Sequence, residues 1–539
     1  MFGLLILMCG YVTTSMAADV LLMPSSLFPV HRQTMIPLAK ELIGRGHKVT
    51  WFEYGLRKSD LPLPSEVEEI FVRVQTPSQT IRDIYEHRNH STHKRIWDDN
   101  FSDEAAQSSA WFSSIELCDR LLSDRSQRTQ FDQLVTRRFD AVVLDDLYNP
   151  CGLLHTGLQR SIFIYWSMTG MRTESAWSHH SPSPPSYIPV PGTGFTDELD
   201  FWERTTNLAA YLRALYVHQH VVLRRIDSLA EKHFPGKLTE AFYMERNASI
   251  NFVNHPPIFD FARPYMPRVN FVGGLHCQKP QPLPKDLDAF VKKANNNDGF
   301  VVISSGRSQQ WKYAPEDVTT NLLAAIAAKP NIQFIWQYDG KKLKSTPDNL
   351  LIQSWLPLQD LLGHEKCKAH VSNGGLNSVI ESMWHGVPVV GWPLTASGYD
   401  NLLRVTARHA GIMLEHKRPT KNQFISAINR VYVQHYKDEA LIFQDMLIDT
   451  PFTELNHAAF WVEFIVRHQE VPHARSGADD LNILSYFLVD VIAFIISAVI
   501  ISITLAYYFF KLLFLGLYSL AITLMPKRPT KVDSKKKRN

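Results

Sequence analysis

Two glycines at the point where an apolar segment meets a helical one are the clearest chemical feature of the sequence. The apolar residues 369–372 predict a strand, Gly374 and Gly375 a turn, and Leu376 the start of a helix that ends near Gly386. Glycines let the backbone approach a ligand closely, and the free N–H groups of a helix N-terminus favour an anion such as a pyrophosphate. A tight turn without any ligand is the alternative interpretation of this local pattern.

Polar side chains at the start of this predicted helix suit a nucleotide. Asn377 and Ser378 lie in its first turn, where they are placed to donate hydrogen bonds. Glu381 follows one turn later on the same face, because residues three and four apart in a helix share a face. We expect its carboxylate to accept hydrogen bonds from ribose hydroxyls.

The N-terminal part of the chain predicts the alternation that positions such sites. Residues 19–23 read as a buried strand, which is followed by a loop containing His31. Residues 34–45 have helical periodicity and end at Gly46, and residues 49–52 read as the next strand. This is the start of a βαβ unit.

Further strands indicate a second unit of the same kind. Residues 140–144 form another apolar run, which ends at Asp145 and Asp146. Residues 178–194 are rich in Ser, Pro and Gly, and we expect them to form a long loop that lines a binding site. A Pro-rich linker begins at His276, and helix and strand patterns alternate again from residue 300 to about 414.

Such alternation predicts the α/β class, with two Rossmann-like parallel-sheet domains that face a cleft. In open sheets of this kind, ligands bind beyond the carboxyl ends of the strands.

Composition excludes some classes of function. The 539 residues carry a formal net charge of only +3, so no nucleic-acid partner is expected. The four cysteines outside the N-terminal segment are Cys118, Cys151, Cys277 and Cys367, and they show no metal-binding spacing. Disulfides and buried free thiols both remain open for them.

Both ends of the chain have the character of targeting or membrane segments. Residues 1–17 resemble a signal peptide, with Ser15 and Ala17 at the −3 and −1 cleavage positions, although a buried first strand is the alternative. Residues 491–510 contain no charged residue and are long enough to span a bilayer. A single helix continuing to Leu524 would be too long for the bilayer core, so a break near Gly516 or an interfacial segment is expected.

The charges around this span predict its orientation. The tail is basic and the preceding flank is acidic, which places the tail in the cytosol and the bulk of the chain in the lumen. Lys536 and Lys537 stand at the −4 and −3 positions of a dilysine retrieval signal of the endoplasmic reticulum, with a simple basic stop-transfer tail as the alternative. Sequons at Asn89, Asn100 and Asn247 agree with this topology.

Residues 355–381 resemble the signature of the UDP-glycosyltransferase family, which includes the animal UDP-glucuronosyltransferases. Residues 271–285, 185–189 and 461–468 also resemble the family, so the similarity covers almost the whole chain. It implies a GT-B architecture with an N-terminal acceptor domain and a C-terminal donor domain. It also implies inverting sugar transfer from a UDP-sugar co-substrate to a small lipophilic acceptor, without a metal or another cofactor.

The resemblance also assigns residues to the donor. Trp355 matches a residue that stacks on uracil, Asn377 and Ser378 match diphosphate contacts, and Glu381 matches a ribose contact. The complete expected set of UDP-sugar-binding residues is Ser304, Arg307, Trp355, Gln359, Asn373, Gly374, Gly375, Asn377, Ser378, Glu381, Asp400 and Asn401.

The resemblance further assigns the catalytic pair. His31 and Met35 fit the family's His-x-x-x-Met spacing, in which the histidine is the general base, and Asp145 matches the aspartate paired with it. An imidazole that takes the acceptor's proton during attack typically gives a 10²–10⁴-fold rate gain. A carboxylate behind the ring fixes its tautomer and stabilises the imidazolium.

Several donor positions depart from the family pattern. Asn373 stands in place of a histidine, Leu358 in place of a glutamine, Arg307 in place of a serine, and Ser397-Gly398 in place of the Asp-Gln pair that reads the sugar. The transferred sugar therefore stays open between glucuronic acid and neutral hexoses. A catalytically weak homologue that binds UDP or a partner in the membrane is the alternative function.

The expected organisation combines these features. It comprises a signal peptide (1–17), an acceptor domain (18–275), a donor domain (276–450), C-terminal helices that return toward the N-terminal domain (451–489), a transmembrane helix (490–510) and a short hydrophobic and basic cytosolic tail (511–539). The protein is expected to be a single-pass type I protein of the endoplasmic reticulum membrane, and an oligomer with itself or with related transferases stays open.

Overall fold

The computed structural model describes residues 17–75, 78–79, 81–82, 95–98, 104–306, 311–343 and 345–526. These residues fall into two compact units, one ending at Arg475 and the other beginning at Ser476. The proposed signal peptide, except Ala17, and the basic tail from residue 527 lie outside the described residues.

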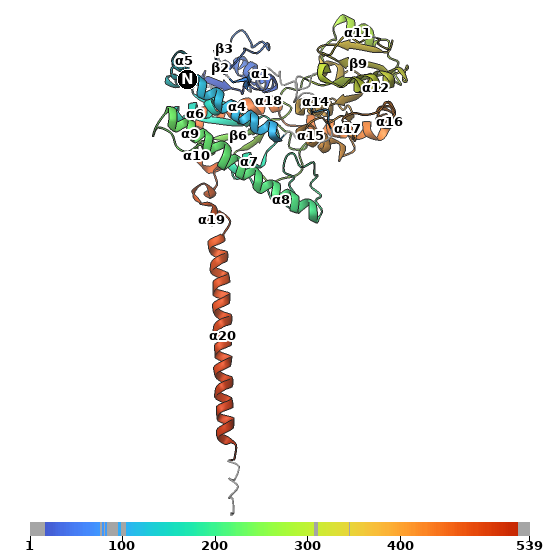
Figure 1. The fold of residues 1–539 in the computed structure, drawn as a ribbon. Coiled ribbons are helices and arrows are strands. Elements are labelled where there is room, and N and C mark those ends of the chain that lie inside the picture. The colour runs from blue at the N-terminus through green and yellow to red at the C-terminus, as the bar shows by residue number, and fades with distance from the viewer. Residues whose placement is uncertain are drawn as a thin grey trace, which may run out of the picture. The chain divides into compact units, whose positions relative to one another are not determined.

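A seven-stranded parallel sheet forms the centre of the N-terminal part of the first unit (Figure 1). Its strands follow the order β3-β2-β1-β4-β5-β6-β7. They are β1 (Asp19–Met23), β2 (Lys48–Gly55), β3 (Glu68–Arg73), β4 (Ala141–Asp145), β5 (Phe163–Ser167), β6 (Ile250–Val253) and β7 (Val269–Phe271). The strand predicted at residues 19–23 has these bounds.

Helices cover both faces of this sheet. The helices of this domain are α1 (Pro29–Gly44), α4 (Glu104–Ser123), α5 (Arg125–Thr136), α6 (Pro150–Gln159), α7 (Thr173–Ser178), α8 (Phe201–Tyr216), the π-helix η1 (Val217–Leu223), α9 (Arg224–His233) and α10 (Ala241–Arg246), of which α8 lies outside the core. Alternate residues of β1, β2, β4 and β5 enter two separate cores, because successive strand side chains point to opposite faces. One core contains α1 and α18 (Glu454–His468), so the chain returns to this sheet after the second domain.

A six-stranded parallel sheet forms the second domain, with the order β10-β9-β8-β11-β12-β13. Its strands are β8 (Phe300–Ser304), β9 (Gln333–Gln337), β10 (Leu350–Gln353), β11 (Cys367–Ser372), β12 (Val389–Gly391) and β13 (Gly411–Met413). Its helices are α11 (Lys285–Val291), η2 (Trp311–Tyr313), α12 (Glu316–Ala327), α13 (Leu358–Leu362), α14 (Leu376–Trp384), α15 (Ala396–Thr406), α16 (Lys421–Val431) and α17 (Gln434–Ile448), and η3 (Pro472–Ala474) follows α18. The prediction of two Rossmann-like sheets is confirmed.

The first helix begins earlier than predicted. Helix α1 starts at Pro29 instead of Thr34, so His31 lies in its first turn and not in a loop. Proline suits this first position because its ring fixes a helical φ and its missing N–H has no partner to lose there. The predicted end is confirmed, since Arg45 caps the helix and Gly46 follows with a φ of +87°.

The second unit contains η4 (Gly477–Asp480), α19 (Ile483–Tyr486) and α20 (Val489–Leu524). The break expected near Gly516 is wrong, because α20 is one continuous helix of 36 residues, roughly 54 Å long at about 1.5 Å per residue. A single internal glycine costs only about 1 kcal/mol, and the segment contains no proline that would interrupt the helix. The helix is long and apolar enough to cross a membrane.

One disulfide is present among the described cysteines. It joins Cys118 of α4 to Cys151 of α6, whereas Cys277 and Cys367 are free thiols. A disulfide and free thiols, the two outcomes that the sequence left open, therefore both occur among the described cysteines.

A buried arginine fixes α1 to the sheet next to His31. The guanidinium of Arg32 pairs with Glu53 on β2 and with Glu69 on β3 at 2.9 Å, and its Nε donates to the carbonyl of Leu61 at 3.0 Å. Burial raises the pKa of Glu53 above its ordinary value, and the nearby guanidinium only partly opposes this. Removal of Arg32 would leave a buried carboxylate without its partner.

We predict that Arg32→Met lowers the free energy of unfolding by about 3–5 kcal/mol, the usual cost of breaking a buried ion pair. The measurement is denaturant unfolding of the purified chain in detergent, followed by tryptophan fluorescence. Arg120→Met, which removes a more exposed pair with Glu116 on α4, is the control and should cost about 1 kcal/mol or less. Equal losses in both variants would contradict this role for Arg32.

Candidate active site

A histidine and an aspartate meet at the carboxyl edge of the N-terminal sheet. His31 is in the first turn of α1, and Asp145 ends β4, the strand that pairs with β1. The His31 Nδ1 lies 2.7 Å from Asp145 Oδ2, and both residues are buried. Because Nδ1 is held by the carboxylate, Nε2 is the ring nitrogen left to take a proton.

The backbone holds the Asp145 carboxylate in place. Its Oδ2 also accepts a hydrogen bond from the N–H of Ser25 at 2.8 Å, and Oδ1 accepts from the N–H of Leu147 at 3.0 Å. The neighbouring Asp146 has a separate role, since it pairs with Arg172 at 3.0 Å. Both oxygens of Asp145 are therefore fixed, and the histidine ring is oriented through them.

Aromatic side chains form a continuous wall beside His31. The Phe28 ring lies 5.6 Å from the rings of both His31 and Tyr148, and Trp111 continues the row at 5.1 Å from Tyr148. The row ends at His218, whose ring lies 6.3 Å from Trp111. The sequence analysis missed these residues because they are scattered along the chain and only the fold brings them together.

The predicted anion-binding turn has the expected local form. Gly374 has a φ of +88° and donates its N–H to Ser372 Oγ at 3.2 Å, and α14 begins at Leu376 with Gly375 as its N-cap. Ser378 lies in the first turn, where its hydroxyl donates to the carbonyl of Gly375 at 2.8 Å. Asn373 donates to the carbonyl of Ser305 at 3.3 Å.

Close backbone packing explains one departure from the family pattern. A Cβ built on Gly398 would lie 2.5 Å from the carbonyl oxygen of Asn373, and one built on Gly374 would lie 2.1 Å from the carbonyl oxygen of Gly398. Asn401 adds a hydrogen bond to the carbonyl of Gly374 at 2.9 Å. The first turn of α15 is therefore pressed against the turn before α14, and a larger residue at 398 does not fit this arrangement.

Two predicted donor residues instead connect the two domains. Asn377 donates to Thr34 Oγ1 on α1 at 2.9 Å and accepts from Asn254 at 3.2 Å. The Asp400 carboxylate accepts from the backbone N–H groups of Gly192 and Gly194 at 2.5 and 3.3 Å. The helix that carries His31 is thus hydrogen-bonded to the helix that follows the glycine turn.

Two other predicted donor residues, Glu381 and Gln359, contact the interdomain linker. Glu381 Oε1 lies 3.4 Å from His276 Nε2. Gln359 donates to the carbonyl of His276 at 3.0 Å and accepts from the N–H of Gln278 at 2.9 Å. Burial acts to lower the pKa of His276, but Cys277 and Glu381 outweigh it and hold that pKa well above the ordinary value. Trp355 is 45% exposed, so part of its side chain is open to solvent.

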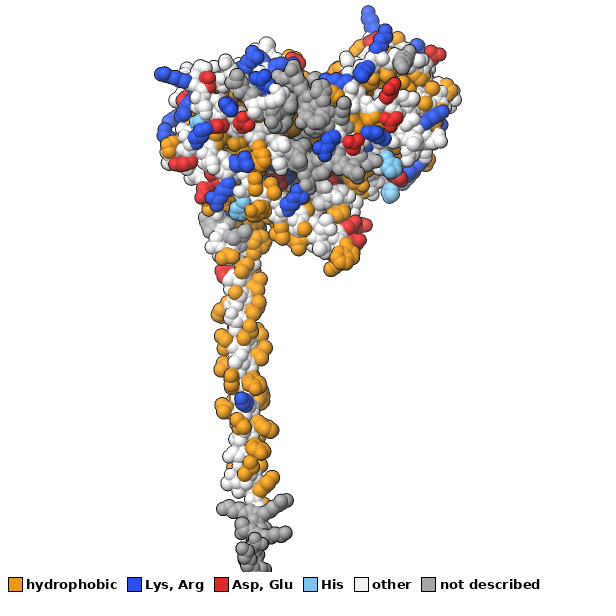
Figure 2. Space-filling view, in the orientation of Figure 1, with side chains coloured by type: hydrophobic (Ala, Val, Ile, Leu, Met, Phe, Trp, Pro, Cys, Tyr) orange, Lys and Arg blue, Asp and Glu red, His pale blue; other side chains and the backbone are white. Residues whose placement is uncertain are grey.

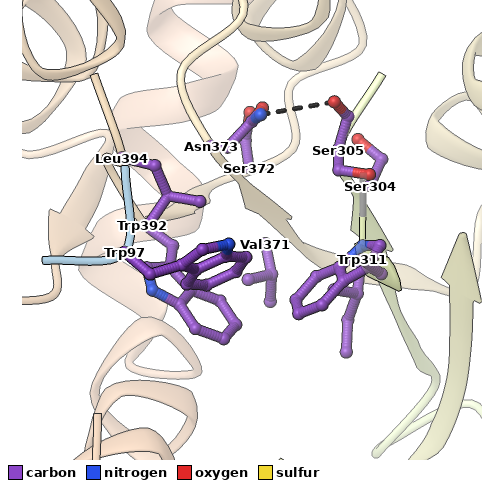
Figure 3. Close-up of a pocket in the computed structure, with 10 residues that line it drawn as sticks. Trp97, Ser304, Ser305, Trp311, Val371, Ser372, Asn373, Trp392 and Leu394 are labelled. Carbon is purple, nitrogen blue, oxygen red and sulfur yellow. Dashed lines mark hydrogen bonds between the residues drawn. The ribbon is translucent and has the colours of Figure 1, made fainter. Parts of the chain in front are cut away.

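A small cavity lies where the strand order of the second sheet reverses, between β8 and β11 (Figure 3). Ser304, Ser305, Ser372 and Asn373 line its polar side. The hydroxyl of Ser304 is already engaged with the buried His370 Nε2 at 2.8 Å. Burial lowers the pKa of His370 to about 3, so this ring is neutral. Arg307 lies outside the described residues.

A tryptophan from the N-terminal domain closes the apolar side of this cavity. Figure 3 shows Trp97 beside Trp311 and Trp392, and the ring centroids lie 5.5 and 6.0 Å from that of Trp97. Arg418 donates to the carbonyl of Trp97 at 3.2 Å and pairs with Asp98 at 3.0 Å. The sequence gives no sign of this contact, because residues 95–98 lie far from the second domain in the chain.

Within the part of the chain that the structure describes, no three His, Cys, Asp or Glu side chains are grouped so as to hold a metal ion. The described site residues offer a buried imidazole, a helix N-terminus, hydroxyls and amides.

Comparison with known proteins gives this geometry its context. Residues 18–519 match the family UDP-glucoronosyl and UDP-glucosyl transferase. The chain belongs to this family, and it is a UDP-glycosyltransferase that takes sugar from a UDP-sugar. The resemblance noted in the sequence is confirmed.

Individual relatives and solved structures agree. The chain is 31% identical to human UDP-glucuronosyltransferase 2B17 over 515 residues, covering 92% of this chain and 93% of the relative. It is 30% identical to human UDP-glucuronosyltransferase 2A3 over 482 residues, covering 86% and 87%. A UDP-glucosyltransferase from Polygonum tinctorium has a TM-score of 0.57 at 17% identity, covering 84% of this chain and 99% of that chain, and supports the GT-B fold.

We predict that Trp97→Ala loosens the contact between the two domains. Loss of a buried tryptophan typically costs about 3–5 kcal/mol, and Trp311 and Trp392 would lose the ring that packs against them. Amide hydrogen exchange should speed up around these two tryptophans and at the ends of β8 and β11. Trp202→Ala, at a side chain that is 73% exposed, is the control. Unchanged exchange in Trp97→Ala would show that this contact does not hold the domains.

We predict that Gly398→Ala destabilises the donor domain by about 1–3 kcal/mol, because the added methyl group meets a backbone oxygen that has no room to move. UDP binding, measured by calorimetry, should weaken with it. Gly44→Ala is the control, since a Cβ at Gly44 meets nothing within 4 Å. A Gly398→Ala protein with the melting temperature and UDP affinity of the parent would contradict the packing argument.

Proposed function

We propose that this UDP-glycosyltransferase transfers a hexosyl or glucuronosyl group to a hydroxyl of a small lipophilic acceptor, with inversion and with His31 as general base. The single observation that carries the proposal is the buried hydrogen bond between His31 Nδ1 and Asp145 Oδ2. The aromatic wall of Phe28, Tyr148 and Trp111 supports an apolar acceptor.

In the proposed reaction, the acceptor hydroxyl gives its proton to His31 Nε2 as its oxygen attacks the anomeric carbon of the sugar. The bond from that carbon to the UDP oxygen breaks on the opposite face, so the configuration inverts. Asp145 stabilises the imidazolium that forms. The leaving diphosphate is stabilised by the N-terminus of α14, where free N–H groups favour negative charge, so the proposal requires no metal or cofactor.

The UDP part of the donor is assigned to the second domain. Trp355 is the proposed uracil platform, and Glu381 the proposed ribose contact, which nucleotide binding would draw from His276. Gly374, Gly375 and Ser378 form the proposed diphosphate site. The sugar stays open because Ser397-Gly398 offers fewer polar groups than the family's Asp-Gln pair.

We further propose that α20 anchors the protein in the endoplasmic reticulum membrane. The charge-free residues 491–510 within it are long and apolar enough for a single crossing. The lumenal position of the first unit follows from Asp490 on one side of the span and the basic tail on the other. The exposed sequon residue Asn247 supports the same orientation, and Asn89 and Asn100 lie outside the described residues.

A catalytically weak, UDP-binding homologue is the second candidate. It is favoured by the protein partners that already occupy Asn377, Gln359 and Glu381, and by the close packing at Gly398. Under this alternative the chain binds UDP without turnover.

We predict that His31→Gln lowers kcat for UDP release by about 10²–10⁴-fold, the usual contribution of a general base, without weakening UDP binding. The assay uses microsomal protein with a panel of UDP-sugars and with phenolic and lipid acceptors. His233→Gln is the matched control, because His233 is also packed against an aspartate, at 2.6 Å from Asp119, but away from the site. UDP release equal to that of the parent in His31→Gln would rule out the base, and UDP binding without turnover in the parent would favour the weak homologue.

A further inference from the structure

Helix α8 (Phe201–Tyr216) buries a polar side chain and exposes its apolar ones, which is the reverse of an ordinary surface helix. The only buried residue of its sixteen is a polar one, Asn207, which is 0% exposed. Its side-chain oxygen accepts from the N–H of Val190, and its amide donates to the carbonyls of Pro185 and Ile188, each at 2.8 Å. A fully satisfied amide therefore holds the helix to residues 185–190, where an ordinary amphipathic helix would use an apolar stripe.

The apolar stripe of α8 faces outward. Phe201, Leu208, Leu212 and Tyr216 recur at spacings of seven and four residues, which places them on one face, and each is 47–63% exposed. Trp202 extends the stripe at its beginning, where its ring packs edge-on against Phe201. Figure 2 shows hydrophobic side chains gathered at the surface over the projecting end of α8.

The order of side chains along this stripe fits a lipid interface. Aromatic residues stand at both ends, with Phe201 and Trp202 at the beginning and Tyr216 at the end, and leucines lie between them. Tryptophan and tyrosine prefer the headgroup level of a bilayer, where one part of the ring is apolar and another is wet. A helix that lies in the plane of the interface buries such a stripe in the boundary between headgroups and acyl chains.

The chain itself limits how far the stripe can be from a membrane. Residues 476–488 connect the first unit to α20, and they span at most about 50 Å even when fully extended. A bilayer crossed by α20 is therefore always within reach of the first unit, wherever the two units lie. A second copy of the chain, by contrast, is not tethered, so its encounter with the stripe depends on the protein concentration.

We propose that the outward stripe of α8 binds the surface of the same bilayer that α20 crosses. This inference rests on the proposed membrane anchoring and adds a second, peripheral attachment. It places the acceptor domain at the lipid surface, from which a lipophilic acceptor can enter without crossing water.

The test uses the full-length chain in liposomes, with an environment-sensitive fluorophore on Leu212→Cys and phospholipids brominated along their acyl chains as quenchers. The matched control is Leu441→Cys on α17, an exposed leucine outside the stripe. The parent chain, treated identically, gives the background from Cys277 and Cys367. We expect a blue-shifted emission and loss of most of the fluorescence at Leu212→Cys, with little change at Leu441→Cys.

Each other outcome overturns the proposal in a distinguishable way. Equal quenching at both positions, or none at Leu212→Cys, would contradict lipid contact by α8. Energy transfer between labelled copies that grows with protein density, without quenching by lipid, would assign the stripe to a second copy. Flotation of the chain with the liposomes is measured separately, so failure of the anchor is told apart from failure of the α8 contact.

Discussion

The hydrogen bond from His31 to Asp145 is the constraint on which the rest of the site depends. It forms because β1 and β4 are neighbours in a parallel sheet, so the helix after one strand and the last residue of the other meet at the same edge. Backbone N–H groups fix the carboxylate, and the Arg32 network fixes the helix. The result is an imidazole with one ring nitrogen engaged by the carboxylate, on a helix that is itself fixed to the sheet.

The second domain is connected by direct contacts to the helix that carries His31. Thr34, three residues after His31 on α1, accepts a hydrogen bond from Asn377 on α14. Trp97 and Asp98 fix a segment of the N-terminal domain to the donor domain beside the cavity at the sheet reversal. Residues expected to contact UDP thus also hold the two domains and the linker together. Donor binding would therefore exchange these internal hydrogen bonds for bonds to the nucleotide. Nucleotide binding would thus be coupled to the arrangement of the two domains.

Much of the fold could be predicted from the sequence, because apolar strands followed by helical periodicity leave few arrangements open. The strands at 19–23 and 300–304 and the turn at Gly374 are examples. The missed features depend on contacts that no local pattern encodes. The helical position of His31 followed from Pro29, and the continuity of α20 from the small cost of one glycine in a segment without proline. The Trp97 contact followed from chain folding alone. The sequence motif likewise does not show which residues Gln359 and Asn377 contact.

The claim that His31 removes the acceptor's proton is tested most directly by varying the acidity of the acceptor. A series of acceptors, from aliphatic alcohols to acidic phenols, is compared at one pH in the parent enzyme and in His31→Ala. If His31 is the general base, the loss in kcat/KM is largest, about 10²–10⁴-fold, for the alcohols and disappears for phenols that ionise without help. A loss of the same size for every acceptor would contradict it and would leave His31 a structural residue.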